Sequence, residues 1–321
     1  MTRKVSVIVV SLNQGRFIGQ MITSFLNQTY KNIEIIIADG GSTDDTFSII
    51  EKYQIENQDV EIRVYHNPNE KTVVDSYWLA IDNARGDYII QGCTSDGLLS
   101  PNWIEICCNI LNSRNDIALV WGLPQHMSED GRLLRVGYPD FELSPPRSDY
   151  DFFPFWVAYH SFALPELNYV LRKNVYIECF PSSNGSEFDL TVSHVSFMRR
   201  FVERGYLPYF VDMVANWGRT HEGQRQVVFS DVETKFWMQY RRWSISFFLE
   251  VVLLGKEYVF RDGFGKKIRL LSVSERFRYI LIFVYESLLR SRPFQLPLAV
   301  VIQKSMLRLI RAVTRIVNSI R

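Results

Sequence analysis

Three short segments, rich in acids, hydroxyls and glycine, have the groups needed to bind a polar ligand or a cation. They are residues 11–14 (SLNQ), 39–45 (DGGSTDD) and 93–97 (CTSDG), and each directly follows an apolar run. Asp39 and Asp96 stand at the ends of such runs, ahead of the residues that would cap a following helix. A carboxylate beside flexible glycines suits a hard cation, or a polar ligand that the backbone approaches closely.

The elements that must position these segments are predicted by the hydrophobic pattern of the first 125 residues. Short β-rich apolar runs predict strands at 5–10, 33–39, 60–66, 87–92 and 117–122. Helical patterns separate them, and Asp44 or Asp45 is the predicted N-cap of the second helix. This alternation predicts an α/β fold with a mostly parallel sheet and helices on both faces. In such sheets the ligand lies beyond the carboxyl ends of the strands, so the three polar segments become candidate site loops.

Composition narrows the class of protein. With 321 residues, of which 47% are hydrophobic, the chain can form one large or two medium-sized domains. The four cysteines show no metal-ligand spacing, which indicates reduced, buried thiols in an intracellular protein. The N-terminus is typical of a first strand rather than of a signal peptide, and no run reaches the roughly 18 apolar residues needed to span a bilayer.

Taken in order, the motifs resemble the opening of family 2 glycosyltransferases of the GT-A fold, in the subgroup with an Asp-Gly-Gly-Ser-Thr-Asp loop. The resemblance rests on SVIVVSLNQGRFIGQMITSFLNQTYKNIEIIIADGGSTDDT, DSYWLAIDNARGDYII and TSDGLLSPNW. It is strong over residues 4–125 and weak from 126 to 225. It implies a Rossmann-like sheet whose nucleotide-sugar half is residues 1–125 and whose acceptor half is residues 126–225. The charge and pattern of the remaining sequence predict a helical, basic region at 226–321.

The resemblance also implies roles for single residues. Asp39 would accept hydrogen bonds from the nucleobase, and Asp96 matches the last acid of the family's DxD motif, which contacts a divalent cation, Mn²⁺ or Mg²⁺. His221 would complete the metal shell or, with Arg219, close over the diphosphate. The expected nucleotide-sugar-binding residues are Ser11, Asn13, Asp39, Gly41, Asp75, Ser95 and Arg219.

The sequence departs from the family pattern at three places. Thr94 stands at the first acid of DxD, and Gly97 stands where another acid often follows the last one. Trp78-Leu79-Ala80 replaces the usual Asn-Lys-Gly, so the lysine expected near the phosphates is missing. These departures leave two readings, a site that binds metal through one acid or a site with weakened metal dependence.

The catalytic base has three candidates in the segment SSNGSEFDLTVSHVSFMRRFVERGY, residues 182–206. Inverting transfer needs a base for the acceptor hydroxyl, and in the family this base is usually an Asp ahead of a helix. Matching acid to acid selects Glu187 or Asp189, whereas counting back from Arg-Gly-Tyr selects His194. We prefer Asp189, and His194 is a chemically competent alternative because its pKa is ordinarily near neutrality.

The C-terminal part of the chain is strongly basic, although the net charge is +1. From Lys256 onward 14 Lys or Arg stand against 4 Asp or Glu, which leaves the rest of the chain at about −9. Residues 297–321 put four cations on one helical face and apolar residues on the other. This pattern favours peripheral contact with an anionic membrane over docking on the catalytic domain or on a second copy of the chain. Nucleic acid is not an expected partner, because no binding motif accompanies the charge.

These observations predict an inverting glycosyltransferase that moves a sugar from a nucleotide-sugar, expected to be UDP-linked. The acceptor would be a glycan or lipid-linked glycan in cell-surface polysaccharide synthesis, on the cytoplasmic face of the membrane. The alternative is a non-catalytic GT-A module that binds a nucleotide-sugar or scaffolds a glycan-assembly complex.

Overall fold

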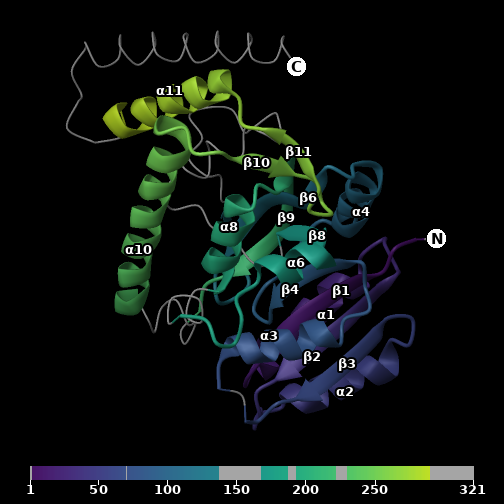
Figure 1. Cartoon of the computed structure of the whole chain (residues 1–321). Helices are drawn as coiled ribbons and strands as arrows, with labels where there is room; N and C mark the ends of the chain where they lie inside the picture. Colours follow the sequence, from purple (N-terminus) through teal and green to yellow (C-terminus); the bar gives the residue numbers. More distant parts are fainter. Residues whose placement is uncertain (1, 70, 137–167, 187–192, 222–229, 290–321) are drawn as a thin grey trace.

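A nine-stranded sheet forms the centre of the molecule (Figure 1). The structure, a computed structural model, describes residues 2–69, 71–136, 168–186, 193–221 and 230–289. The strand order is β3-β2-β1-β4-β8-β6-β9-β5, and β7 pairs with β6. The strands are β1 Val5–Ser11, β2 Ile33–Asp39, β3 Glu61–His66, β4 Tyr88–Cys93, β5 Gly97–Leu98, β6 Ile117–Met127, β7 Leu133–Val136, β8 Tyr169–Arg172 and β9 Leu207–Arg219.

The predicted α/β fold with a mostly parallel sheet is confirmed. Strands β3, β2, β1 and β4 run parallel to one another, as do β6 and β9, whereas β8, β7 and β5 pair in the antiparallel sense. The helices are α1 Gly15–Leu26, α2 Thr46–Glu56, α3 Val73–Asp82, α4 Trp103–Ser113, α6 Lys173–Cys179, α8 Ser193–Glu203, α10 Ser230–Phe248, the π-helix η2 Leu249–Leu253 and α11 Val273–Leu289. The short strand β5 was not predicted from the sequence.

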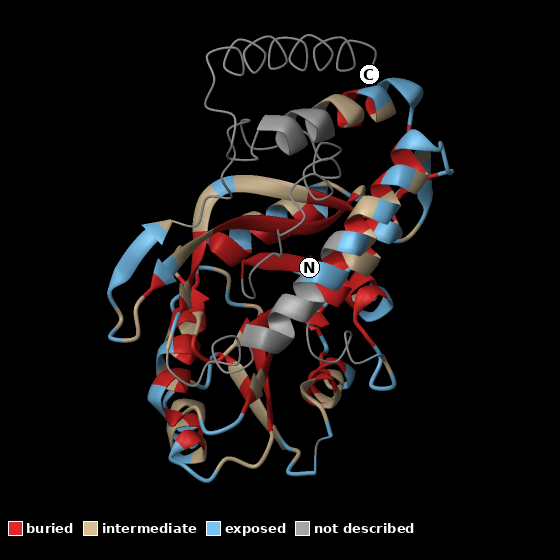
Figure 2. Ribbon diagram, turned by 90° about the vertical axis from the view of Figure 1, so that its left-hand side faces the viewer, coloured by how far each residue is buried: buried red, intermediate tan, exposed pale blue. Residues whose placement is uncertain are grey.

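Strands β1, β2 and β4 are buried on both faces, as their nearly continuous apolar sequences predict (Figure 2). One acid lies inside this core, at the second position of β2. Glu34 is fully buried and accepts hydrogen bonds from Ser6 Oγ at 2.5 Å, Arg63 Nη2 at 2.6 Å and the Arg85 amide at 2.7 Å. Burial alone would raise the pKa of this carboxyl, but these bonds outweigh it and lower the pKa.

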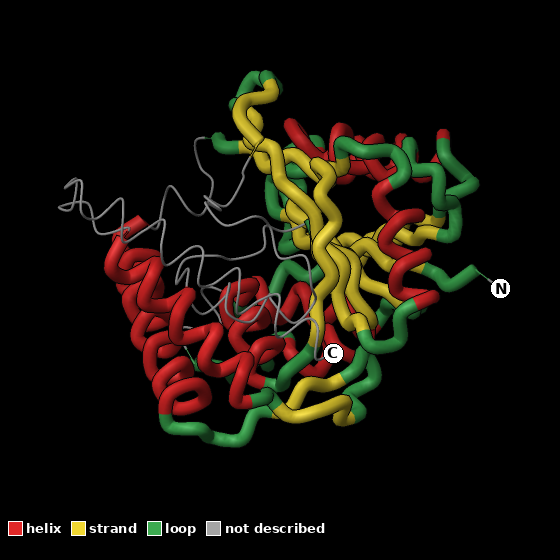
Figure 3. The backbone as a smooth tube through the Cα atoms, turned by 90° about the horizontal axis from the view of Figure 1, so that it is seen from above, coloured by secondary structure: helices red, strands yellow, loops and turns green. Residues whose placement is uncertain are grey.

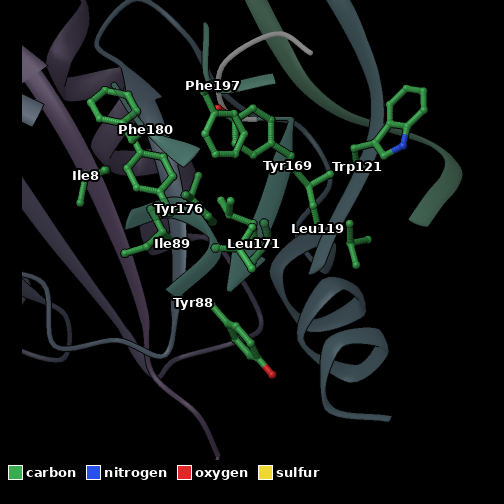
Figure 4. Packing of buried hydrophobic residues seen from close by; sticks show 14 of the residues in the cluster. Ile8, Tyr88, Ile89, Leu119, Trp121, Tyr169, Leu171, Tyr176, Phe180 and Phe197 are labelled. Atoms are coloured by element: carbon green, nitrogen blue, oxygen red, sulfur yellow. The ribbon is translucent and has the colours of Figure 1, made fainter. Parts of the chain in front are cut away.

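Aromatic rings join the middle of the sheet to the helices that follow it (Figure 4). Tyr176 of α6 stacks on Phe180 with ring centroids 4.9 Å apart, and Tyr169 of β8 stacks on Phe197 of α8 at 6.1 Å. All four rings are buried. This cluster fixes the start of α8 against the sheet, and α8 carries one of the predicted catalytic bases.

The C-terminal helices α10 and α11 are joined by η2 and a hairpin made of β10 Val259–Arg261 and β11 Lys267–Leu270. The hairpin lies at the amino ends of β6 and β9, away from the β6–β7 ribbon (Figure 3). The Gly263 amide donates to the Asn115 carbonyl at 2.9 Å, just before β6 begins. Within the part of the chain that the structure describes, no helix has the length and apolar character to cross a membrane.

Candidate active site

The carboxyl ends of β1, β2, β3 and β4 lie side by side at one edge of the sheet. Ser11 pairs with Asp39, Asp39 pairs with His66, and Val10 pairs with Cys93 in the strand register. The loops that leave these strands therefore start from neighbouring positions. The three polar segments of the sequence all begin at this edge, as expected for a parallel sheet.

Hydrogen bonds cross-link the first two polar segments. Asn13 has a φ of 52°, a left-handed conformation that Asn tolerates better than most residues. Its amide donates to Ser42 Oγ at 2.8 Å, and its Oδ1 accepts from the Thr43 amide at 2.8 Å. The Gly40 amide donates to the Ser11 carbonyl at 2.9 Å. Ser11 and Asn13 are thus part of one connected surface, and their contact with a nucleotide stays a prediction.

Asp39 is fully buried, and its carboxylate organises the second segment. Oδ1 accepts hydrogen bonds from the amides of Gly41 at 2.9 Å and Ser42 at 2.7 Å, and Oδ2 accepts one from Ser42 Oγ at 2.6 Å. Gly41 has a φ of 98°, which a residue with a Cβ rarely adopts. The structure therefore gives Asp39 and Gly41 a role in shaping the loop, and their contact with the nucleotide stays a prediction.

The predicted start of the second helix is confirmed, but the side-chain hydrogen bonds at this end come from Asp44. Asp45 occupies the N-cap position of α2, but its side chain makes no capping hydrogen bond. Asp44 instead accepts from the Thr46 amide at 3.1 Å and from the amide of Gly15, at the start of α1, at 3.0 Å. The carboxylate of Asp44 therefore holds the first turns of two helices together, because both present amides without a helical partner.

Asp75 lies in the first turn of α3, where it forms a capping box with Thr72. A hydrogen bond from Ser183 and those from Thr72 lower the pKa of the Asp75 carboxyl. One turn further along, Trp78 Nε1 donates to the Pro181 carbonyl at 2.7 Å. Helix α3 is therefore fastened to the segment that leads toward the predicted catalytic bases, and the predicted nucleotide contact of Asp75 stays a prediction.

Asp96 lies partly buried just beyond the end of β4. Its Oδ1 accepts hydrogen bonds from the Arg219 amide at 2.9 Å and from Ser95 Oγ at 3.3 Å. Burial raises the pKa of the Asp96 carboxyl to about 7, and these two hydrogen bonds only partly oppose the rise. Among the described residues none donates to Oδ2, so this oxygen remains available to a cation or ligand.

The packing beside Asp96 leaves no room for an acid at position 97. A Cβ at Gly97 would lie 2.2 Å from the Trp217 ring, because Gly97 pairs with Trp217 between β5 and β9. No acidic side chain fits there unless the indole moves. Thr94 and Ser95 are both buried, at 4% and 3% exposure, so Ser95 presents little surface for the predicted donor contact.

Arg219 and His221 lie at the end of β9 and contact the same ring of α1. The Arg219 guanidinium lies over Phe17 at 5.0 Å from the ring centroid, and the His221 ring lies 4.8 Å from it. All three guanidinium nitrogens of Arg219 donate to protein groups. The acceptors are the Ser95 carbonyl at 3.3 Å, the Glu129 carbonyl at 2.9 Å and Gln20 Oε1 at 2.5 Å.

The predicted catalytic bases are only partly within the described residues. His194 is the second residue of α8 and is partly buried. Glu187 and Asp189 lie outside the described residues, so the choice among the three stays a prediction. In the described ranges no group of three or more His, Cys, Asp or Glu side chains is arranged to hold a metal ion.

Sequence reasoning missed two residues that shape this edge of the sheet. Gln20 supplies an acceptor for Arg219, and Trp217 closes the space beside Gly97. No motif marks either of them. Gln20 lies on the same face of α1 as Phe17, three residues earlier, and that helical spacing is the one signal that could have linked them.

Comparison with protein families identifies the kind of domain that contains these strand ends. Residues 6–161 match the model described as glycosyl transferase family 2. This region is a family 2 glycosyltransferase domain. The match covers all of β1 except Val5 and continues through β7, so it includes all three polar segments. Assignment of the domain to the subgroup with the Asp-Gly-Gly-Ser-Thr-Asp loop stays a prediction.

Curated relatives of the glycosyltransferase domain cover part of the chain. Glycosyltransferase GlyG of Streptococcus pneumoniae serotype 4 is 30% identical over 131 residues, which are 41% of this chain and 42% of that protein. Chondroitin synthase of Pasteurella multocida is 31% identical over 139 residues, which are 43% of this chain and 14% of that protein. The chain therefore matches less than half the length of these relatives.

Solved structures extend the likeness of the fold beyond the glycosyltransferase domain. Staphylococcus aureus TarS 1–349 covers 92% of this chain and 75% of its own length, with a TM-score of 0.55 at 14% identity. A mannosyltransferase of Pyrobaculum calidifontis, in complex with GDP-Man and Mn²⁺, covers 80% and 77%, with a TM-score of 0.51 at 11% identity. The fold of the chain is GT-A, as predicted.

Proposed function

We propose that this chain is an inverting glycosyltransferase that transfers a sugar from a UDP-sugar to a glycan or lipid-linked glycan acceptor. The observation that carries the proposal is the edge where Ser11, Asp39 and Cys93 end neighbouring parallel strands, with Asp96 just beyond. Residues 1–125 would supply the nucleotide-sugar half of the site, and residues 126–225 the acceptor half. The TarS fold, solved also in complex with UDP-GlcNAc, supports a UDP-linked donor.

The side chains at this edge fit a divalent cation that the donor itself mainly holds. Asp96 offers Oδ2, and the predicted second ligand is His221. One carboxylate together with phosphate oxygens and water is a usual arrangement for Mg²⁺ in proteins. Bound there, Mg²⁺ or Mn²⁺ would neutralise the charge of the nucleoside diphosphate leaving group.

The reaction needs one proton acceptor besides the donor site. Asp189, with Glu187 and His194 as alternatives, would take the proton of the acceptor hydroxyl. The hydroxyl oxygen forms a bond to the anomeric carbon while the bond to the diphosphate oxygen breaks, so the configuration inverts. Ser11, Asn13, Asp39, Gly41, Asp75 and Ser95 would bind and orient the donor.

The proposal is tested by incubating the full chain with a panel of UDP- and GDP-sugars. We expect release of UDP from one UDP-sugar in the presence of Mn²⁺, and a large loss of release on addition of EDTA. Isothermal titration with UDP measures binding separately. Absence of binding to every nucleotide-sugar would overturn the proposal.

A second function, a non-catalytic module that binds nucleotide-sugars, is favoured by two observations. The Trp217 ring occupies the space of an acidic side chain at position 97, and Thr94 replaces the first acid of the metal motif. Such a module would bind UDP-sugars, yet neither hydrolyse nor transfer them under any metal condition. Slow metal-dependent hydrolysis in the assay above would exclude it.

We also propose that the chain lies peripherally on the cytoplasmic face of the cell membrane, with residues 297–321 as the main contact. That segment lies outside the described residues, and its basic amphipathic sequence supports the proposal. Flotation with anionic liposomes, before and after removal of residues 297–321, is the direct test. Equal flotation of the two forms would count against a role for this segment.

A further inference from the structure

Arg219 joins three separate segments at the candidate site. The residue is 5% exposed, and its guanidinium donates to Ser95 of the loop after β4, to Glu129 of the β6–β7 turn and to Gln20 of α1. The guanidinium also lies over the Phe17 ring. Three hydrogen bonds from a planar, permanently charged group to three different elements fix their relative positions.

The same residue also holds the Asp96 carboxylate directly. The Arg219 amide donates to Asp96 Oδ1 at 2.9 Å, while Arg219 Nε donates to the carbonyl of Ser95 at 3.3 Å. Both the backbone before Asp96 and one oxygen of its side chain are therefore bonded to a single residue of β9. This arrangement fixes Oδ1 in protein hydrogen bonds, while Oδ2 receives no donor from the described residues.

Binding of a diphosphate by this guanidinium would require it to leave its present partners. The Ser95 and Glu129 carbonyls would each lose a donor, and leaving the buried Ser95 carbonyl unpaired would be costly. A different cation is exposed beside it on the first turn of α1. Arg16 has 62% of its side chain exposed, and it pairs with the Glu129 carboxylate. The two arginines are thus distinct, one buried among protein acceptors and one at the surface.

We propose that Arg219 is a positioning residue, which holds Asp96 for the cation and does not bind the phosphates of the donor. The proposal deepens the proposed function, because it rests on donor binding at this edge of the sheet. Outer groups that orient a metal ligand typically change metal affinity by roughly 10- to 100-fold when removed. The guanidinium should therefore act on binding through Asp96 alone.

Calorimetric titration of UDP, with Mn²⁺ and with EDTA, separates the two roles. We expect Arg219→Gln to weaken Mn²⁺-dependent UDP binding by roughly 10- to 100-fold, and to leave metal-free UDP binding unchanged within about twofold. In the Asp96→Asn background the same change should have no further effect, since the ligand that Arg219 positions is already lost. A phosphate-binding role predicts weaker binding with and without Mn²⁺, and effects that add to those of Asp96→Asn; that result would overturn the proposal.

Two further variants keep the test informative if Arg219→Gln folds poorly. Gln20→Ala removes one partner of the guanidinium from the exposed side of α1, and it should reproduce a smaller loss of Mn²⁺-dependent binding. Arg16→Gln is the matched control for a nearby positive charge, and it should leave the ratio of Mn²⁺-dependent to metal-free binding unchanged. The proposal would be contradicted if Gln20→Ala left Mn²⁺-dependent UDP binding unchanged while Arg16→Gln lowered the ratio of Mn²⁺-dependent to metal-free binding.

Hydrogen exchange of the ligand-free protein distinguishes failure of this proposal from failure of the proposed function. Amides of residues 94–98 should exchange at least several-fold faster in Arg219→Gln than in the wild type, because the Ser95 and Asp96 contacts are gone. If the wild type binds no nucleotide, the proposed function fails. The exchange rates then still test whether Arg219 holds Asp96 in position. Unchanged exchange in this segment would overturn the positioning role.

Discussion

The amino-terminal half of the sheet and the C-terminal helices differ in how they use their surfaces. In the first 125 residues, the large exposed hydrophobic side chains among the described residues are Leu12 and Ile55. Between residues 249 and 277 there are eight, namely Leu249, Leu253, Leu254, Phe264, Ile268, Leu270, Val273 and Phe277. In the first region the polar groups of the loops hydrogen-bond to one another. In the second region many apolar side chains are exposed to solvent. This difference agrees with the two proposals, a small-ligand site in the first region and contact with a larger surface in the second.

The largest expected effect lies in the first region, at Asp96. Asp96→Asn should lower metal-dependent transfer by roughly 10² to 10³, because it removes a charge that stabilises the leaving group. Rates of UDP release with saturating Mn²⁺ measure the loss. Asp45→Asn is the matched control, since Asp45 is exposed and makes no capping hydrogen bond. Equal rates in the wild type and Asp96→Asn would show that this carboxylate does not serve the reaction.

The next largest effect is a pH dependence of folding stability in the second region. It comes from a buried glutamate. Glu275 is 1% exposed and receives two hydrogen bonds from Arg269 at 2.7 Å and one from Ser272 Oγ at 2.8 Å. Burial would raise the pKa of its carboxyl, but these bonds dominate and lower the pKa to about 2. Because the folded-state pKa lies below the unfolded value, the stabilisation is complete above pH 4.5 and is lost as pH falls toward 2.

Glu275→Gln should therefore destabilise the fold by about 3 kcal/mol at pH 7 and by roughly half as much at pH 3. Urea unfolding at the two pH values, followed by the fluorescence of the tryptophans, measures the difference. Glu250→Gln is the control, because Glu250 is a more exposed partner of Lys256 and should leave the urea midpoint unchanged. An equal loss of stability at pH 3 and pH 7 would contradict the linkage.

How far the sequence predicts the structure differs between the two regions for a physical reason. The ends of β2 were predicted at Ile33 and Asp39 as observed, because its seven residues are apolar but for Glu34 and the terminal Asp39. The carboxyl edge with Asp39 and Asp96 also followed, since parallel strands end together. For the second region the sequence indicated a helical, basic stretch, without its hairpin or its exposed apolar residues.

The details of the site were beyond prediction because they depend on contacts between distant residues. Strand β5 exists because Gly97 pairs with Trp217, and a two-residue strand has no pattern of its own. The partners of Arg219 lie on three elements, and the nearest in sequence is 90 residues away. A family motif identifies such an arginine as important, but it does not tell whether the guanidinium faces a ligand or the protein.

A smaller effect tests the close packing of the first region, at Gly97. Gly97→Ala places a Cβ 2.2 Å from the Trp217 ring and should destabilise the fold by about 1 to 3 kcal/mol. Gly218→Ala is the matched control in the neighbouring strand, because a Cβ there meets nothing within 4 Å. Its unfolding midpoint should agree with that of the wild type. If Gly97→Ala were equally neutral, the indole would have room to move, and an acid at position 97 would also be tolerated.

The smallest effect on stability is expected in the second region. Leu254 and Val273 are each 81% exposed, so Leu254→Ser and Val273→Ser should change the free energy of unfolding by less than about 0.5 kcal/mol. Leu271→Ser, at a buried position between them, should be clearly destabilising. Flotation with anionic liposomes then assigns a use to these exposed side chains. Reduced flotation of the two stable variants would place this surface against the membrane, whereas flotation equal to that of the wild type would restrict membrane contact to other parts of the chain.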